Sequence, residues 1–235
     1  MNVDRFTVVK SLMKTLSLLA GMALWLGWAC GSSAADLTLK VVEKEPPKEL
    51  GDTIRAALQS KALQLLDGDK LAYEFWFASE IPLKSKPASL EKALDSVAPA
   101  TLLGAVSIPT ARRDYRNDEL AAGIYTMRFA LQPQDGDHLG TTAYLTFGVL
   151  VQARHDPTLD GITTYRSLVR ASARDTTTEH PLTLSLRPAA TEGGEPQLQT
   201  PAPEHKCVRV KIPAKAGEEK TALTFEIVYE GHAKH

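Results

Sequence analysis

The chain has 235 residues, of which 43% are hydrophobic and 23% are charged, and this length suffices for one domain with its own core. Its 27 basic and 28 acidic residues give a formal net charge of −1, without a block of Lys or Arg. Such a balance argues against nucleic acid or an anionic membrane surface as the partner.

The first 35 residues have the pattern of an export signal. A basic start precedes the apolar stretch Leu16 to Ala29, and Ser33-Ala34-Ala35 supplies small residues before Asp36. The apolar stretch is shorter than the ~20 residues that a spanning helix needs. The pattern predicts a signal peptide over 1–35, no membrane span in the mature form, and a periplasmic or extracellular protein. Cleavage would leave 27 − 3 = 24 basic and 28 − 1 = 27 acidic residues, a net charge of −3.

Cys30 offers a lipid anchor as the alternative. Lipoprotein signals usually have Leu three residues before the cysteine, but Gly27 stands there and Leu26 is one position further back, which argues against lipidation. In either case Cys30 is removed or blocked, so Cys207 has no cysteine to pair with. We therefore expect a fold that is held by its core without an internal disulfide.

Residues 36–235 are predicted to form a single mainly β domain. In Gly123–Leu131 the residues Tyr125, Met127, Phe129 and Leu131 should face inward, while Thr126 and Arg128 face solvent. Such alternation is typical of antiparallel sheets with one buried face, whereas Ala143–Val151 is apolar on both faces and predicts a central strand. The further predicted strands are Leu37–Val42, Ala62–Leu66, Leu71–Phe77, Leu102–Ile108, Leu182–Leu186, the segment around Val208, Val210 and Ile212, and Leu223–Tyr229.

Helices are the minority in this pattern. Apolar residues at helical spacing predict short helices over Lys48–Gln59, over Ser89–Val97 with Ser89 as N-cap, and from the N-cap Asp160 to Ala173. Pro188–His205 has few apolar side chains and is predicted to be a flexible loop or a contact arm. The predicted fold is an antiparallel β-sandwich decorated with two or three short α-helices.

One block resembles known proteins. Gly123 to Gly140 (GIYTMRFALQPQDGDHLG), followed by the apolar strand and Asp156-Pro157, is similar to a block in uncharacterised exported β-rich proteins of environmental, planctomycete-like bacteria. The resemblance extends loosely from Pro46 to Leu186. It implies an exported β-rich architecture with a loop over Asp135–His138, and it implies no activity.

Enzyme motifs are absent from the sequence: it has no G-x-S-x-G, H-E-x-x-H or C-x-x-C pattern and no phosphate-binding glycine loop. A type 1 copper site fails on spacing, because the next His after Cys207 is His232 and no Met follows. Cys207 is interpreted as a small buried hydrophobe.

The histidines leave a zinc or copper site open as an alternative. His138 and His155 flank a strand of roughly 30 Å, at ~3.3 Å per residue, so they should not share an ion. The path of the chain favours His138 with His180, or His155 with His205 and His232. Solvated loop positions explain the same residues without a metal, and no cofactor is our first expectation.

Ligand binding has separate candidates. Asp135, Asp137 and His138 are candidate ligand contacts, and Asp135 and Asp137 could bind Ca²⁺, but turn formation is the favoured explanation of these residues. Trp76 faces away from the predicted core side of its strand and is either packed beneath a helix or exposed; an exposed Trp76 beside Arg128 or Tyr144 would form a stacking platform.

These observations lead to a first hypothesis of a non-catalytic envelope protein that binds a partner protein or a surface polymer through its loops. The second hypothesis is a metal-binding protein or metal-dependent enzyme that uses the histidine cluster. The third is a hydrolase with its site in the loop Gln132–Thr141. The sequence does not indicate the oligomeric state.

Overall fold

The computed structural model describes residues 37–114, 118–133, 144–176, 180–202 and 205–231. The chain divides into two units, Met1–Ala35 and Asp36–His235, and all described residues belong to the second. In its described residues this unit is mainly β with two short α-helices, so the predicted fold class is confirmed. Within the described residues, no helix is long and apolar enough to cross a membrane.

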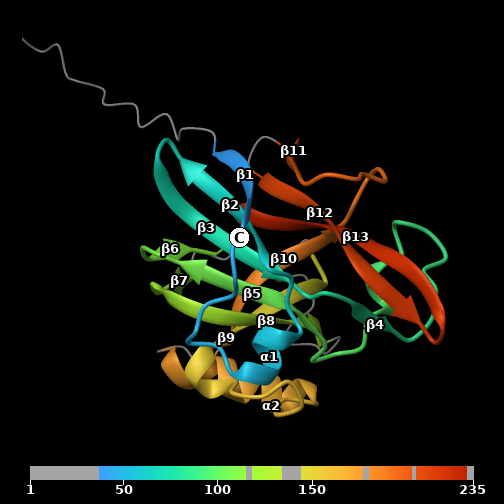
Figure 1. Ribbon diagram of the computed structural model, residues 1–235, viewed down its shortest axis with the longest axis horizontal. Helices are drawn as coiled ribbons and strands as arrows, with labels where there is room; N and C mark the ends of the chain where they lie inside the picture. The colour runs from blue at the N-terminus through green and yellow to red at the C-terminus, as the bar shows by residue number, and fades with distance from the viewer. Residues whose placement is uncertain (1–36, 115–117, 134–143, 177–179, 203–204, 232–235) are drawn as a thin grey trace, which may run out of the picture. The chain divides into compact units, whose positions relative to one another are not determined.

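The elements follow one another as shown in Figure 1. The strands are β1 (Thr38–Glu43), β2 (Lys61–Asp67), β3 (Lys70–Phe77), β4 (Ile81–Leu83), β5 (Leu102–Ile108), β6 (Arg112–Arg113), β7 (Glu119–Leu120), β8 (Gly123–Leu131), β9 (Thr146–Gln152), β10 (Leu182–Pro188), β11 (Gln197–Ala202), β12 (His205–Ala216) and β13 (Glu219–Glu230). The helices are α1 (Asp52–Ala56) and α2 (Tyr165–Ser172), with 3₁₀ turns η1 (Leu94–Ser96), η2 (Ala153–His155) and η3 (Ala173–Asp175).

One sheet contains nearly all of these strands. Its order is β1-β2-β3-β5-β8-β9-β10-β13-β12-β11, and its neighbours are antiparallel, while β4 adds in parallel to β12. The sheet curls back on itself: the Tyr73 hydroxyl on β3 donates to the Tyr229 carbonyl on β13 at 3.4 Å, although the two strands are five positions apart. The two layers of the predicted sandwich are therefore two halves of a continuous sheet.

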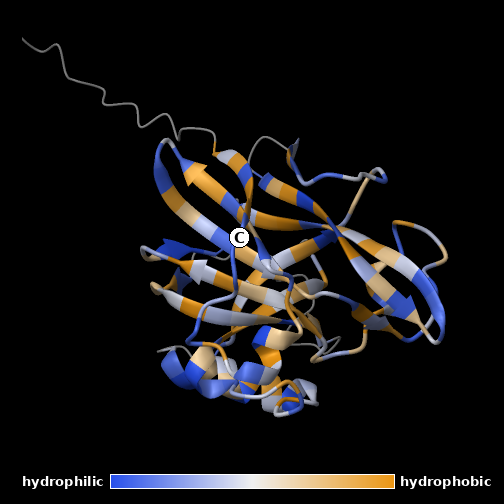
Figure 2. Ribbon diagram, in the orientation of Figure 1, coloured by the Kyte–Doolittle hydropathy of each residue, from blue (hydrophilic) through white to orange (hydrophobic). Residues whose placement is uncertain are grey.

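The inward side chains of the curled sheet form the main core. Figure 2 shows apolar and polar residues alternating along the strands, as the sequence pattern predicts. The main core includes Tyr73, Phe75, Met127, Phe129 and Phe225, all of them fully buried. Two segments cover the ends of this core: the β6–β7 hairpin contributes Leu120 at one end, called the hairpin end below, and residues 81–97 contribute five apolar residues at the other.

The outer face of the sheet is also covered; the sequence pattern left this open for Trp76 and did not predict it for Thr126 and Arg128. Ile54 of α1 packs with Trp76 of β3, and Leu168 of α2 packs with Val149 and Val151 of β9. Figure 1 shows both helices on the same side of strands β5, β8 and β9. The expectation of a solvated outer face is therefore wrong for Thr126 and Arg128, which are buried under this second layer.

The predicted helices are shorter than the apolar spacing suggested. Helix α1 ends early because Leu58 forms a bridge with Ala78, which draws the chain into the sheet. Ser89–Val97 contains turns and η1 in place of a helix. Helix α2 starts after Thr164: the Thr164 hydroxyl accepts from the Ser167 amide at 3.2 Å in a capping box. The predicted cap Asp160 lies outside the helix.

The stretch Pro188–His205, predicted to be a flexible loop or a contact arm, contains a strand. Gln197–Ala202 forms the edge strand β11, paired with β12. Arg209 of β12 holds the preceding loop by donating to Thr191 Oγ1 and Gln197 Oε1. Leu198 is the one residue of this strand with a described side chain that packs against the main core, so the sequence lacks the apolar alternation of a strand.

Candidate binding pocket

A pocket of about 350 Å³ lies where α1, the β3–β4 connection, the start of β5 and the segment after β9 meet. This volume falls in the range of small-ligand sites. Most of its walls are aliphatic. The lining residues are Ala57, Ala78, Glu80, Pro82, Pro99, Ala100, Thr101, Leu102, Arg128, Leu159, Asp160, Ile162 and Thr163.

A buried ion pair supports one wall of this pocket. Arg128 Nε donates to Asp156 Oδ2 at 2.7 Å, and Arg128 Nη2 donates to Asp156 Oδ1 at 3.0 Å. Thr126 Oγ1 adds a hydrogen bond of 2.6 Å to Asp156 Oδ2. Arg128 is 2% exposed and Asp156 is fully buried, so both charges depend on this arrangement for compensation.

The remaining donors of Arg128 bind backbone carbonyls. Nη1 donates to Ala100 at 3.0 Å and to Ile162 at 3.3 Å, and Nη2 donates to Leu159 at 2.9 Å. The five N–H groups of the guanidinium are thereby used by the chain itself. Arg128 was predicted as a ligand contact beside an exposed Trp76; it instead joins the two segments that form the pocket wall.

Helix α1 and the segment after β9 are fixed to each other as well. The Leu159 amide donates to Thr53 Oγ1 at 3.0 Å. Gly51 approaches Pro157 so closely that an added Cβ would lie 1.7 Å from the Pro157 carbonyl oxygen. These two segments that line the pocket are therefore held together by defined contacts.

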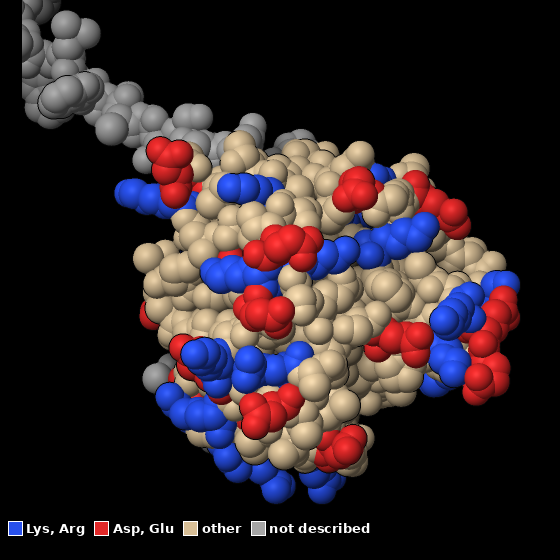
Figure 3. Space-filling view, viewed as in Figure 1, with Lys and Arg blue, Asp and Glu red and all other residues tan. Residues whose placement is uncertain are grey.

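Two carboxylates, Glu80 and Asp160, line the pocket from different segments, and both residues are exposed. Among the described residues neither forms an ion pair. The charge of Arg128 is neutralised by Asp156 inside the wall. The pocket thus combines aliphatic walls with a negative rim, whereas Figure 3 shows basic and acidic side chains interspersed over the face drawn there.

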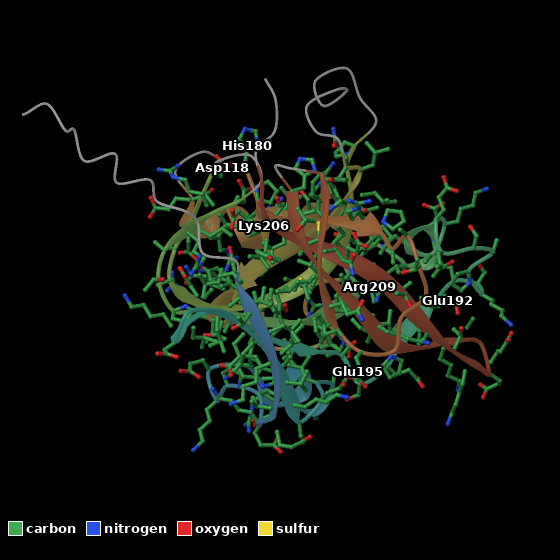
Figure 4. All side chains as sticks on the ribbon, turned by 90° about the horizontal axis from the view of Figure 1, so that it is seen from above. Asp118, His180, Glu192, Glu195, Lys206 and Arg209 are labelled. Carbon is green, nitrogen blue, oxygen red and sulfur yellow. The ribbon has the colours of Figure 1, made fainter. Side chains whose placement is uncertain are left out.

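Two smaller pockets are described elsewhere. One, of about 210 Å³ at the hairpin end, is lined by Asp118, Tyr125, Asp175 and His180, and Figure 4 shows Asp118 and His180 side by side. The other, of about 110 Å³, lies between β1 and β12. Of these three pockets, the one of about 350 Å³ is the largest.

The predicted histidine groupings fare differently. His180 precedes β10, whose Leu182 pairs with Leu150 near the end of β9, so His180 lies at the His155 end and not at the start of β9, as the pairing with His138 required. His205 begins β12, which lies three strands away from β9 in the sheet. At about 4.8 Å per strand, His205 is therefore separated across the sheet from His155, which follows β9. His138 and His232 lie outside the described residues.

His155 and His205 have local partners. His155 Nε2 lies 3.0 Å from Asp175 Oδ2, and Arg154 and Arg174 contact the same imidazole. Tyr144 Oη lies 2.8 Å from His205 Nδ1. In the part of the chain that the structure describes, no group of three or more His, Cys, Asp or Glu side chains could hold a metal ion. The trio with His232 stays a prediction.

The remaining candidates divide between buried and undescribed positions. Trp76 is 1% exposed and its Nε1 donates to the Lys44 carbonyl at 3.0 Å, so the interpretation of Trp76 as packed beneath a helix is confirmed and the stacking platform is excluded. Cys207 is fully buried, as predicted, and burial, assisted by the nearby Glu226, raises its pKa to about 12. Asp135, Asp137 and most of the loop Gln132–Thr141 lie outside the described residues.

Sequence reasoning missed the pocket itself. Glu80 belongs to no sequence pattern that indicates a binding site. Asp160 was interpreted as a helix cap, because an Asp before an apolar helical stripe is a common start signal for a helix. No family model, curated protein or solved structure matches this chain. The resemblance to uncharacterised exported β-rich proteins therefore stays a prediction.

Proposed function

We propose that this chain is a non-catalytic exported protein of the cell envelope that binds a partner protein or a surface polymer at the 350 Å³ pocket. The export pattern of residues 1–35 supports the location, and the aliphatic, preformed pocket supports the binding role.

The observation that carries this proposal is the construction of the pocket wall. The protein buries a charged guanidinium and a carboxylate to fix the segment 156–162 against β8 and residue 100. A bidentate buried pair is costly to desolvate and is held together by strict geometry. Fixing a concave wall in this way reduces the ordering that a ligand would otherwise have to impose, which favours binding.

The proposal is tested by closing the pocket mouth. Thr163 is exposed and lines the pocket, so Thr163→Trp should fill the entrance. Asp69→Trp is the matched control, because Asp69 is exposed in the β2–β3 turn, at the opposite end of β3 from the pocket residue Ala78. Wild type and both variants, each checked for an unchanged urea midpoint, are used as bait in envelope extract. A recovered partner is then purified and its Kd is measured.

We expect wild type and Asp69→Trp to bind the same partner with equal Kd, and Thr163→Trp to bind at least about tenfold more weakly, the effect of losing a central contact. Equal binding by all three proteins would remove the pocket from the proposal. Failure of the wild type to retain any partner under mild conditions would count against the binding function itself.

A further inference from the structure

We infer that the pocket receives the side chain of a lysine presented by a protein partner, so that the aliphatic stem lies against the walls and the ammonium lies at the rim. This inference rests on the binding function proposed above and names the chemistry of the ligand.

The walls match the stem. Ala57, Ala78, Leu102 and Ile162 present aliphatic carbon to the cavity, and Pro82 and Pro99 add two more apolar surfaces. A chain of four methylene groups gains binding free energy as its apolar surface leaves water. The volume of about 350 Å³ holds such a stem with room for the adjoining backbone.

The rim matches the cation. Glu80 lies in the β3–β4 connection and Asp160 follows η2, and both residues line the pocket. Among the described residues neither carboxylate is paired with a cation. A lysine ammonium that enters the pocket would meet complementary charge from both carboxylates.

Other ligand chemistries fit less well. The lining contains no aromatic side chain, so the stacking surface that sugar rings use is absent from this pocket. Anions would face two carboxylates, and the guanidinium of Arg128 has already committed its donors to Asp156 and to backbone carbonyls. A basic protein segment is thereby favoured over a polysaccharide.

The test uses three peptides that differ only at the end of the central side chain. The probes are acetyl-Ala-Lys-Ala-amide, the same peptide with Nε-acetyl-lysine, and the same peptide with norleucine, which keeps the stem and lacks the ammonium. Binding to the full chain is followed by NMR shifts of the Thr101 and Thr163 amides, in 20 mM and 300 mM salt. Chito-oligosaccharide serves as the polymer probe.

We expect the lysine peptide to bind about tenfold more tightly than the other two at low salt, with the preference shrinking at high salt because the carboxylates are exposed. The double variant Glu80→Gln, Asp160→Asn should reduce lysine binding to the norleucine level. Asp69→Asn, which removes an exposed carboxylate at the other end of β3, should leave the preference intact.

Equal binding of the lysine and acetyl-lysine peptides would overturn the inference, as would a preference that survives the double variant or an absence of peptide binding up to 10 mM. Stronger shifts with chito-oligosaccharide would assign the pocket to a polymer. In these cases a partner that Thr163→Trp no longer binds would still leave the proposed function standing. Retention of that partner by Thr163→Trp would overturn the inference and remove the pocket from the proposed function.

Discussion

Replacing Asp156 by Ala removes the acceptor at the centre of the buried network. Three hydrogen bonds are lost, from Thr126 Oγ1 and from Nε and Nη2 of Arg128. The guanidinium then remains in a site that is 2% exposed, without a compensating charge. Breaking a buried pair in this way costs about 3–5 kcal/mol, because the remaining charge is desolvated and unpaired.

This cost is large relative to the total stability of a domain, which is about 5–15 kcal/mol. For a domain of this size it corresponds to a fall in Tm of about 6–20 °C, at 2–4 °C per kcal/mol. The loss should be partly recovered in Arg128→Met, Asp156→Leu, where both charges are removed and the space is filled by apolar atoms. Asp156→Ala should therefore be less stable than the double variant.

Urea unfolding monitored by circular dichroism measures these differences. Glu219→Gln provides the control, since the Lys86–Glu219 pair has side chains 60% and 55% exposed and should contribute less than about 1 kcal/mol. If Asp156→Ala cost no more than Glu219→Gln, the network would not be the support of the pocket wall that the geometry indicates.

Three further predictions test other parts of the structure. Gly51→Ala should destabilise the fold by about 1–3 kcal/mol, because its Cβ would meet the Pro157 carbonyl oxygen at 1.7 Å, whereas Gly194→Ala, with open space around it, should be neutral in urea unfolding. In a chain that begins at residue 36, Trp76 is the sole tryptophan. Its fluorescence emission should be blue-shifted, and the buried indole should be shielded from quenching by iodide until the chain unfolds. Strong quenching in the native state would contradict its burial. Because burial raises the pKa of Cys207 from 9.0 to about 12, its thiol should resist Ellman's reagent at pH 8 when the chain is folded. The contribution of the neutral thiol to stability should be complete below pH 9 and lost as the pH rises towards 12. The urea midpoint should therefore fall over this pH range, and it should fall less in Cys207→Ala.

The main core could be predicted from the sequence because alternation reports directly on burial. Tyr125, Met127 and Phe129 face the core as expected, and β9 lies centrally between β8 and β10. Leu131 is the exception, at 38% exposed, because it ends its strand. Local alternation cannot reveal that the two predicted layers belong to one sheet, since this depends on which strands pair.

The burial of Thr126 and Arg128 under the second layer, and the pocket, could not be predicted for a different reason. Thr126 and Arg128 are polar, so the pattern assigned them to solvent. Their burial depends on Asp156, which is distant in sequence and reaches them only after β9 has returned beside β8. A buried ion pair of this kind has no periodicity to detect. Thr164 was likewise missed, although Thr followed by Ser at the third position satisfies both sides of a capping box.

Arg128 and the rim carboxylates should respond differently to mutation because they act at different levels. Arg128 binds the carbonyls of Ala100, Leu159 and Ile162, so its loss should lower the unfolding midpoint and the ligand affinity together. Glu80 and Asp160 are exposed and unpaired within the described residues, so their neutral variants should change the ligand affinity and its salt dependence. The free energy of unfolding of these variants should stay within about 0.5 kcal/mol of wild type. A matched pair of unfolding and binding measurements on the two kinds of variant separates the group that builds the pocket from the groups that select its ligand.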